Sequence, residues 1–253
     1  MAKEDRPKTA FSFPGGGLWR FKRMPMRLSN SAPVFERLME QVLTGLTWKT
    51  CLVYLDDIII FSNSFEKHMQ NLREVFQRLK EANLKLSPKK CNFLKKEVKY
   101  LGHIVSESGV STDPSKIQAV RDWPIPKNIK EVRGFLGLTS YYRKCILKYA
   151  DRAKPLHKIT EKNQKFVWTE DCHYSFEELK KALTRAPILA YPAREGFFIL
   201  DTDASNVGIG AVLSQVQDRL EKVVCYFSKT ISISERSYCV TSRELAFPPL
   251  FIW

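Results

Sequence analysis

Two adjacent carboxylates, Asp56 and Asp57, have the setting in this sequence that most directly suggests chemistry. They lie between two strongly apolar runs, Cys51–Val53 and Ile58–Ile60, where an ordinary surface loop would be more polar. Burying neighbouring carboxylates is costly unless cations neutralise them. Carboxylates that hold divalent ions are a common device of phosphoryl-transfer enzymes. Mg²⁺ fits such a site, with Mn²⁺ as the alternative metal, and a solvated hairpin turn is the plain alternative for the pair itself.

The charge of the chain indicates the kind of partner. Its 253 residues carry a formal net charge of +14, which favours an anionic partner, usually nucleic acid, over an inert basic surface. No apolar run approaches the roughly 20 residues that cross a bilayer, so we expect no membrane partner. The scattered cysteines contain no Cys-x-x-Cys pair, and they favour reduced thiols inside the cell, in cytoplasm or nucleus, over disulfides or zinc. They are Cys51, Cys91, Cys145, Cys172, Cys225 and Cys239.

Apolar spacing predicts the elements that must position these residues. In the first half of the chain, Ser64 caps a helix whose apolar face includes Leu72 and Leu79. Residues 83–87 should turn into a strand. The other elements expected there are a helix over 32–46, a strand-turn-strand unit over 50–61 and a hairpin over 98–105 around Gly102.

The second half of the chain alternates between predicted helices and strands. Helices are expected over 115–123, 129–138, 141–156, 172–185 and 235–245, and strands over 197–201, 208–215 and 222–228. Glycines at 208 and 210 suggest close backbone approach. The helix over 141–156 mixes aromatic and cationic residues, which suits phosphates and stacked bases but also suits a core with a charged exterior. The pattern as a whole predicts an α+β fold.

Several segments, in order, resemble the palm of reverse transcriptases from gypsy-type long-terminal-repeat retrotransposons. They are Lys8–Pro14, Arg23–Met39, Cys51–Ser62, Leu84–Phe93 and Tyr100–Val105. Asp122–Arg143 is similar to the family's helical thumb, and Phe166–Leu245 resembles its ribonuclease H domain. The resemblance implies a partial palm with fingers over residues 1–108, a helical thumb over 109–163 and an incomplete ribonuclease H-like domain over 164–253.

The resemblance also implies roles for particular residues. Tyr54-Leu55-Asp56-Asp57 looks like the family's metal-binding tetrad, with Asp56 the stronger ligand and Asp57 its neighbour. Met26 and Arg27 fall in the nucleotide-binding stretch. The loop that grips the primer end would be formed by Tyr100, Leu101, Gly102 and His103.

In the ribonuclease H-like part, Asp203 occupies the family's first catalytic position and Glu244 matches its helical glutamate. Both would bind metal and act in catalysis. Asp201 is the nearby alternative, because strand alternation places it on the same face as Asp203. A carboxylate that merely ends a strand and a solvated helical glutamate are the structural alternatives.

Three departures from the family pattern lower the expected activity. The motif that carries the first palm aspartate should precede Lys8, and Arg27 stands where the family usually has glycine. A third nuclease aspartate should follow Glu244, yet Pro248 and Pro249 interrupt the helix there. We therefore expect a piece of a longer polyprotein with little or no activity of its own.

The expected function is RNA-directed DNA polymerisation joined to ribonuclease H cleavage, by two-metal phosphoryl transfer. Its partners would be an RNA template, a DNA primer, an RNA–DNA hybrid and deoxynucleoside triphosphates. The alternatives are a non-catalytic nucleic-acid-binding remnant of a retroelement and a degenerate copy without a selected role. The oligomeric state stays open.

Overall fold

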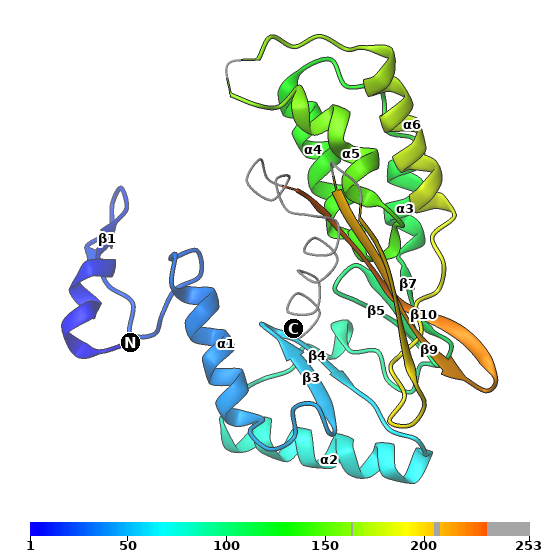
Figure 1. Cartoon of the computed structure of the whole chain (residues 1–253). Helices are drawn as coiled ribbons and strands as arrows, with labels where there is room; N and C mark the ends of the chain where they lie inside the picture. The colour runs from blue at the N-terminus through cyan, green and yellow to red at the C-terminus, as the bar shows by residue number, and fades with distance from the viewer. Residues whose placement is uncertain (163, 205–207, 232–253) are drawn as a thin grey trace. The chain divides into compact units, whose positions relative to one another are not determined.

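The computed structural model describes residues 1–162, 164–204 and 208–231, and the chain divides into two compact units (Figure 1). The first unit is Met1–Asn92 and the second is Phe93–Trp253. The helix expected over 235–245, with Glu244, lies outside the described residues. Among the helices that are described, none is long and apolar enough to cross a membrane.

The first unit consists of short antiparallel strand pairs and two amphipathic helices. Strand β3 pairs with β4, and β1 pairs with β2. In chain order the elements are η1 (Lys3–Thr9), β1 (Phe11–Ser12), β2 (Leu18–Trp19), α1 (Ser31–Val42), β3 (Cys51–Tyr54), β4 (Asp57–Ile60), α2 (Phe65–Glu81) and η2 (Pro88–Lys90).

Helices α1 and α2 both pack against the β3–β4 hairpin, as Figure 1 shows. Their buried side chains include Met39 from α1 and Val75 from α2, and they meet Cys51 of β3 in one apolar cluster. The Ser64 hydroxyl accepts a hydrogen bond from the Lys67 amide, which confirms the predicted cap of α2. The strand expected after Asn83 is wrong, because the chain runs without pairing into η2 at Pro88.

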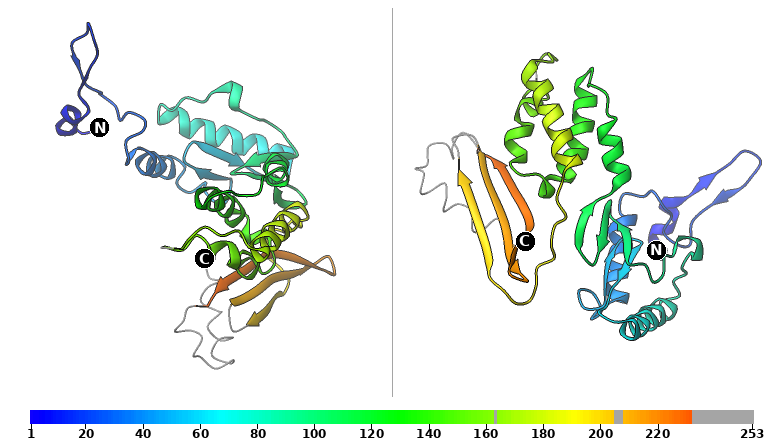
Figure 2. Two further views of the ribbon diagram at one scale, coloured as in Figure 1. Left: turned by 90° about the horizontal axis from the view of Figure 1, so that it is seen from above. Right: turned by 90° about the vertical axis from the view of Figure 1, so that its right-hand side faces the viewer.

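The second unit holds two three-stranded antiparallel sheets and four helices among its described residues (Figure 2). The first sheet has the order β5-β6-β7 and the second has the order β10-β9-β8. The elements are β5 (Glu97–Tyr100), β6 (His103–Ser106), β7 (Gly109–Thr112), α3 (Pro114–Arg121), α4 (Ile129–Tyr141), η3 (Arg143–Cys145), α5 (Tyr149–Lys158), α6 (Glu170–Thr184), β8 (Phe198–Ala204), β9 (Gly208–Gln217) and β10 (Leu220–Thr230).

Helices α4, α5 and α6 enclose the largest apolar cluster, to which they contribute Phe135, Leu156 and Phe176. Asn128 and Thr169 cap the first and last of these helices through hydrogen bonds from the amides three residues on. The single helix expected over 141–156 is wrong, since the chain breaks into η3 between α4 and α5. Lys148 takes a left-handed backbone with φ of 54° just before α5, and that conformation ends any continuous helix.

A short connecting segment ties the two sheets of the second unit together. Val110 of β7 and Leu189 exchange two backbone hydrogen bonds of 2.8 and 2.9 Å, and the next amide, at Ala190, donates to the carbonyl of Val223. Gly109 is needed at this junction because its φ is +133° and an added Cβ would lie 2.2 Å from the Leu189 carbonyl oxygen. The hairpin β6–β7 is therefore anchored to the strand β10 through the segment that follows α6.

Candidate catalytic and nucleic-acid sites

The aspartate pair lies at the turn of the β3–β4 hairpin. Tyr54 pairs with Asp57 as the last residues of the two strands, and Leu55 and Asp56 form the turn between them. Leu55 has a left-handed backbone with φ of 54°, which lets two residues reverse the chain. Both carboxylates are exposed, so the apolar strands on either side present them to solvent rather than bury them.

Helix α1 holds this turn from one side. The carboxylate of Glu36 accepts a hydrogen bond from the backbone amide of Leu55. A charged acceptor makes a stronger hydrogen bond than a neutral one, and this bond fixes the backbone next to Asp56. Nothing in the spacing of the sequence pointed to Glu36, which lies 19 residues earlier. Glu36 lies on helix α1, which packs against β3, and this packing is the feature that identifies it as a partner of the turn.

The donor set around this turn is small. Within residues 1–162, 164–204 and 208–231, no group of three or more His, Cys, Asp or Glu side chains could hold a metal ion. Asp56 and Asp57 thus supply two carboxylates, and the described residues do not complete a two-metal site.

Met26 and Arg27, expected at the nucleotide-binding stretch, lie in an irregular segment before α1. Met26 is 91% exposed, and Arg27 adopts φ of 70°, a conformation that favours glycine. The bulky cation thus stands at a backbone position of the kind that glycine fills in the family pattern. Within the described part of the chain, no hydrogen bond or ion pair joins either residue to the aspartate pair.

The expected primer loop is the turn of the β5–β6 hairpin, and two tyrosines from the end of α4 hold it. The hydroxyl of Tyr142 donates to the Gly102 carbonyl at 2.6 Å, and the hydroxyl of Tyr141 donates to the Leu101 carbonyl. The His103 ring stacks on the Tyr141 ring and meets the Tyr142 ring edge-on, with ring centroids 5.5 and 5.3 Å apart, respectively. The turn is therefore fixed through both its backbone and its side chain.

Burial sets the protonation of this cluster. It raises the pKa of Tyr142 to about 12, so the phenol keeps the proton that it donates. Burial also lowers the pKa of His103, although a backbone hydrogen bond at Ser111 opposes the shift. The His103 Nδ1 atom is buried and has no hydrogen-bond partner among the described residues, so a proton added there would have no acceptor among them. The ring is accordingly held neutral.

Asp203 lies in β8, opposite Gly210 of β9, and Asp201 lies two residues earlier opposite Val212. The two carboxylates share one face of the strand, as alternation predicted. The Lys148 ammonium lies 2.6 Å from the Asp203 carboxylate, and this hydrogen bond raises the pKa of Lys148. Nothing in the sequence pattern pointed to Lys148, which precedes α5 and lies far from Asp203 along the chain.

One of the two glycines of β9 lies at the close approach that the sequence suggested. An added Cβ at Gly208 would lie 2.6 Å from the Asp151 carboxylate oxygen and 3.3 Å from the Lys229 carbonyl oxygen, so a side chain there would push the Asp151 side chain aside. An added Cβ at Gly210 would make only ordinary contacts, the nearest at 3.8 Å. Helix α5 also reaches this sheet through the amide of Ala150, which donates to the Ser228 hydroxyl of β10. Asp203 is therefore positioned by contacts between helix and sheet within one unit, while Glu244 lies outside the described residues.

Two family models match the chain. Residues 1–105 match the model of reverse transcriptase, described as RNA-dependent DNA polymerase, and residues 168–247 match an RNase H-like domain found in reverse transcriptase. The first match covers the tetrad turn and the primer turn. The second covers Asp203 and extends past Glu244.

Relatives and solved structures agree with these matches. The chain is 45% identical over 97% of its length to a retrovirus-related Pol polyprotein from transposon 297, and 37% identical to that from transposon gypsy, both of Drosophila melanogaster. It spans 23% and 24% of their lengths. The fold is similar to that of a foamy viral protease-reverse transcriptase solved with double-stranded DNA, with a TM-score of 0.84 and 24% identity. That likeness covers 97% of this chain and 43% of the viral one.

Proposed function

Because the chain belongs to the reverse transcriptases of retrovirus-related Pol polyproteins, we propose that it binds a template–primer duplex and supplies the aspartate pair of an RNA-directed DNA polymerase. The observation that carries this proposal is the β3–β4 turn, which presents Asp56 and Asp57 to solvent on a backbone anchored by Glu36. An exposed carboxylate pair on a rigid turn can meet a metal–nucleotide complex without first being uncovered.

Divalent-metal dependence belongs to the proposal as a property of the family. Mg²⁺, when bound, would supply electrostatic stabilisation of the transferring phosphoryl group, and Mn²⁺ can replace it. Asp56 is the stronger ligand and Asp57 its neighbour. Since the described residues do not complete the site, polymerisation by this chain alone is weak or absent.

The β5–β6 turn has the second role. We assign to Tyr100, Leu101, Gly102 and His103 the contact with the primer end, and the rigidity of this turn supports the assignment. A primer terminus has to be held within a fraction of an ångström for in-line attack, and a turn fixed by two hydroxyls and a ring stack offers such a support. Met26 and Arg27 are assigned to the incoming nucleotide.

The second half of the chain is assigned to RNA–DNA hybrid recognition and cleavage. Asp203 and Glu244 are its proposed catalytic carboxylates, with Asp201 beside Asp203 on the same strand face. Lys148 forms an ion pair with Asp203 in which both side chains are largely exposed, so a metal ion can displace the ammonium at small cost. We expect little cleavage by this chain alone.

A primer-extension assay tests the polymerase assignment. It uses an RNA template, a DNA primer, labelled deoxynucleotides and Mg²⁺ or Mn²⁺, and compares the chain with Asp56→Asn and with Glu40→Gln as an exposed control on α1. We expect trace synthesis that Asp56→Asn removes and Glu40→Gln leaves unchanged. Robust synthesis would refute the weak-activity part, and synthesis that survives Asp56→Asn would refute the role of the tetrad.

A non-catalytic nucleic-acid-binding role is the second candidate. The net charge of +14 favours it. Fluorescence anisotropy with an RNA–DNA hybrid at increasing salt separates the candidates, because binding through phosphates weakens steeply as salt rises. Hybrid binding with no synthesis in either metal supports this second role, and no binding at low salt refutes both.

A further inference from the structure

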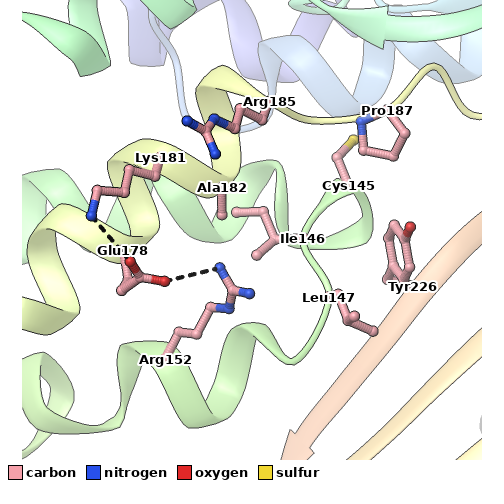
Figure 3. A pocket seen from close by; sticks show the side chains of 10 residues that line it. All are labelled: Cys145, Ile146, Leu147, Arg152, Glu178, Lys181, Ala182, Arg185, Pro187 and Tyr226. Atoms are coloured by element: carbon pink, nitrogen blue, oxygen red, sulfur yellow. Dashed lines mark hydrogen bonds and ion pairs between the residues drawn. The ribbon is translucent and has the colours of Figure 1, made fainter.

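A cavity of about 330 Å³ lies in the second unit among α5, α6, the η3 segment and β10. Figure 3 shows that its charged side chains gather on one side and its apolar side chains on the other. The charged side is formed by Arg152 of α5, by Glu178 and Lys181 of α6, and by Arg185, which follows α6. Leu147 and Tyr226 lie opposite them.

The charged side carries an excess of positive charge. Glu178 is shared between Arg152 at 3.8 Å and Lys181 at 3.4 Å, and both distances are long for an ion pair. Arg185 forms no ion pair with any residue that the structure describes. Three cations thus face one carboxylate. The Arg152 and Glu178 side chains are only 34% and 26% exposed, so solvent screens their charge less than it would on an open surface. Lys181 and Arg185 are exposed at the mouth of the cavity.

The opposite side suits a flat organic group. Tyr226 projects from β10 with a half-buried ring, and Leu147 is 43% exposed beside it. Burial raises the pKa of Tyr226, so its phenol stays neutral and can donate a hydrogen bond to an anion. Burial likewise raises the pKa of the Cys145 thiol to about 11, and the thiol adds no negative charge to the cavity. The volume lies within the range of small-ligand sites, roughly 300 to 1,000 Å³.

We propose that this cavity binds the phosphate group of a nucleotide, with Arg152, Lys181 and Arg185 on the phosphate and Tyr226 and Leu147 against the sugar or base. The nucleotide is either free or the 5′-phosphate end of a strand, since both present the same chemistry. Arginine pairs with a phosphate group through two parallel N–H donors. A chloride ion cannot accept both donors in this geometry. The site is separate from the aspartate turn and does not rest on polymerase activity.

Isothermal titration with adenosine 5′-monophosphate and with inorganic phosphate tests the proposal. We expect the wild-type chain and Asp56→Asn to bind the nucleotide equally, so that failure of the proposed polymerase role leaves this result unaffected. Arg152→Gln and Arg185→Gln should each weaken nucleotide binding about tenfold or more. Lys154→Gln, at an exposed position on the same helix as Arg152, is the matched control and should leave the affinity unchanged.

A variant that is expected to strengthen nucleotide binding distinguishes a binding effect from a loss of folding. Glu178→Gln removes the carboxylate that competes for Arg152 and Lys181, so nucleotide binding should tighten several-fold. The proposal is overturned if the wild type binds no nucleotide at millimolar concentration, if Lys154→Gln weakens binding as much as Arg152→Gln, or if Glu178→Gln fails to tighten it. Equal affinities for inorganic phosphate and for adenosine 5′-monophosphate would also overturn the proposal, because Tyr226 and Leu147 would then contribute nothing to binding.

Competition identifies the source of the phosphate. Adenosine 5′-monophosphate bound to the chain is challenged with a short DNA strand that carries a 5′-phosphate and with the same strand that carries a 5′-hydroxyl. Stronger displacement by the phosphorylated strand supports the site and assigns it to a strand end. Displacement by neither strand, with the effects of Arg152→Gln and Arg185→Gln retained, supports the site and assigns it to a free nucleotide. Equal displacement by both strands would overturn the proposal, because internal phosphates would then bind as well as a terminal one.

Discussion

The turns at Tyr54–Asp57 and Tyr100–His103 begin with the same two residues and have opposite surroundings. Each joins two antiparallel strands, each pairs its tyrosine with the fourth residue, and each has a leucine with positive φ, 54° at Leu55 and 47° at Leu101. The first turn exposes two carboxylates, and its Leu55 amide donates a hydrogen bond to the Glu36 carboxylate of α1. The second is covered by two tyrosines and an aromatic stack.

The contrast follows from what each turn offers. The first turn presents carboxylate oxygens, so side chains packed over it would block the access of a metal ion or nucleotide. The second has no carboxylate and offers backbone and an imidazole, whose position depends on packing. One local pattern, Tyr-Leu followed by two variable residues, therefore serves as an open turn in the first unit and as a clamped turn in the second. If this comparison is right, the same kind of change should cost much more at the clamped turn.

The largest difference is expected for tyrosine truncation. Tyr142 is 1% exposed, so Tyr142→Ala should lower the free energy of unfolding of the second unit by about 3 to 5 kcal/mol. Tyr54 is 52% exposed, and Tyr54→Ala should cost about 1 kcal/mol or less. Urea unfolding measures both. Tyr142→Phe isolates the hydroxyl bond to Gly102 and should cost roughly 1 kcal/mol. Equal costs for Tyr142→Ala and Tyr54→Ala would break the comparison.

A smaller effect is expected at the single anchor of the open turn. Glu36→Ala removes the acceptor of the Leu55 amide, and a hydrogen bond to a charged group contributes about 1.5 to 3 kcal/mol, here toward the lower end because Glu36 is half-buried. Amide hydrogen exchange should show faster exchange at Leu55. Glu40→Ala, an exposed residue one turn later on α1, is the control and should leave that amide unchanged. An unchanged Leu55 amide in Glu36→Ala would show that the turn needs no anchor.

Local signals predicted the elements well where the chain carries its own start and stop residues. Ser64 caps α2 as predicted, and the helix expected from residue 129 begins there as α4, after the cap Asn128. The two hairpins follow from apolar runs around a short turn. The break between α4 and α5 has no proline or glycine to announce it. At this break Tyr142 donates a hydrogen bond to a carbonyl 40 residues away, and Lys148 takes a left-handed backbone.

The candidate site divides in the same way. The positions of Asp56 and Asp57 at a hairpin turn could be predicted, since hairpin geometry acts over a few residues. The strand expected over 197–201 continues to Ala204 and so includes Asp203. Glu36, Tyr142 and Lys148 could not be assigned partners, because each acts across a long stretch of chain that only tertiary packing brings together. The roles of these site residues stay predictions, as does the division of the chain into palm, thumb and nuclease regions.

The smallest effect is expected from pH, and it acts on the clamped turn. Burial lowers the pKa of His103 from its ordinary 6.5, so the unfolded chain binds a proton more readily than the folded chain as the pH falls below that value. This contribution to stability is complete above pH 6.5 and is lost as the pH falls toward the lowered pKa. The second unit should therefore unfold more easily at about pH 5 than at about pH 7. His157 is exposed at the surface, but partial desolvation and then the nearby Arg143 charge lower its pKa, so it contributes in the same direction.

Urea unfolding of the second unit across that pH range separates the two histidines. His103→Phe keeps an aromatic ring between Tyr141 and Tyr142 and removes the titration, so the loss of stability on acidification should shrink. His157→Gln should shrink it independently, and His173→Gln, at an exposed position on α6, should leave it as it is. The first unit contains neither His103 nor His157, so its unfolding should lack this contribution. An acid response in His103→Phe as large as in the wild type would mean that the clamp tolerates a charged imidazole, and the distinction between the turns would then rest on the tyrosines alone.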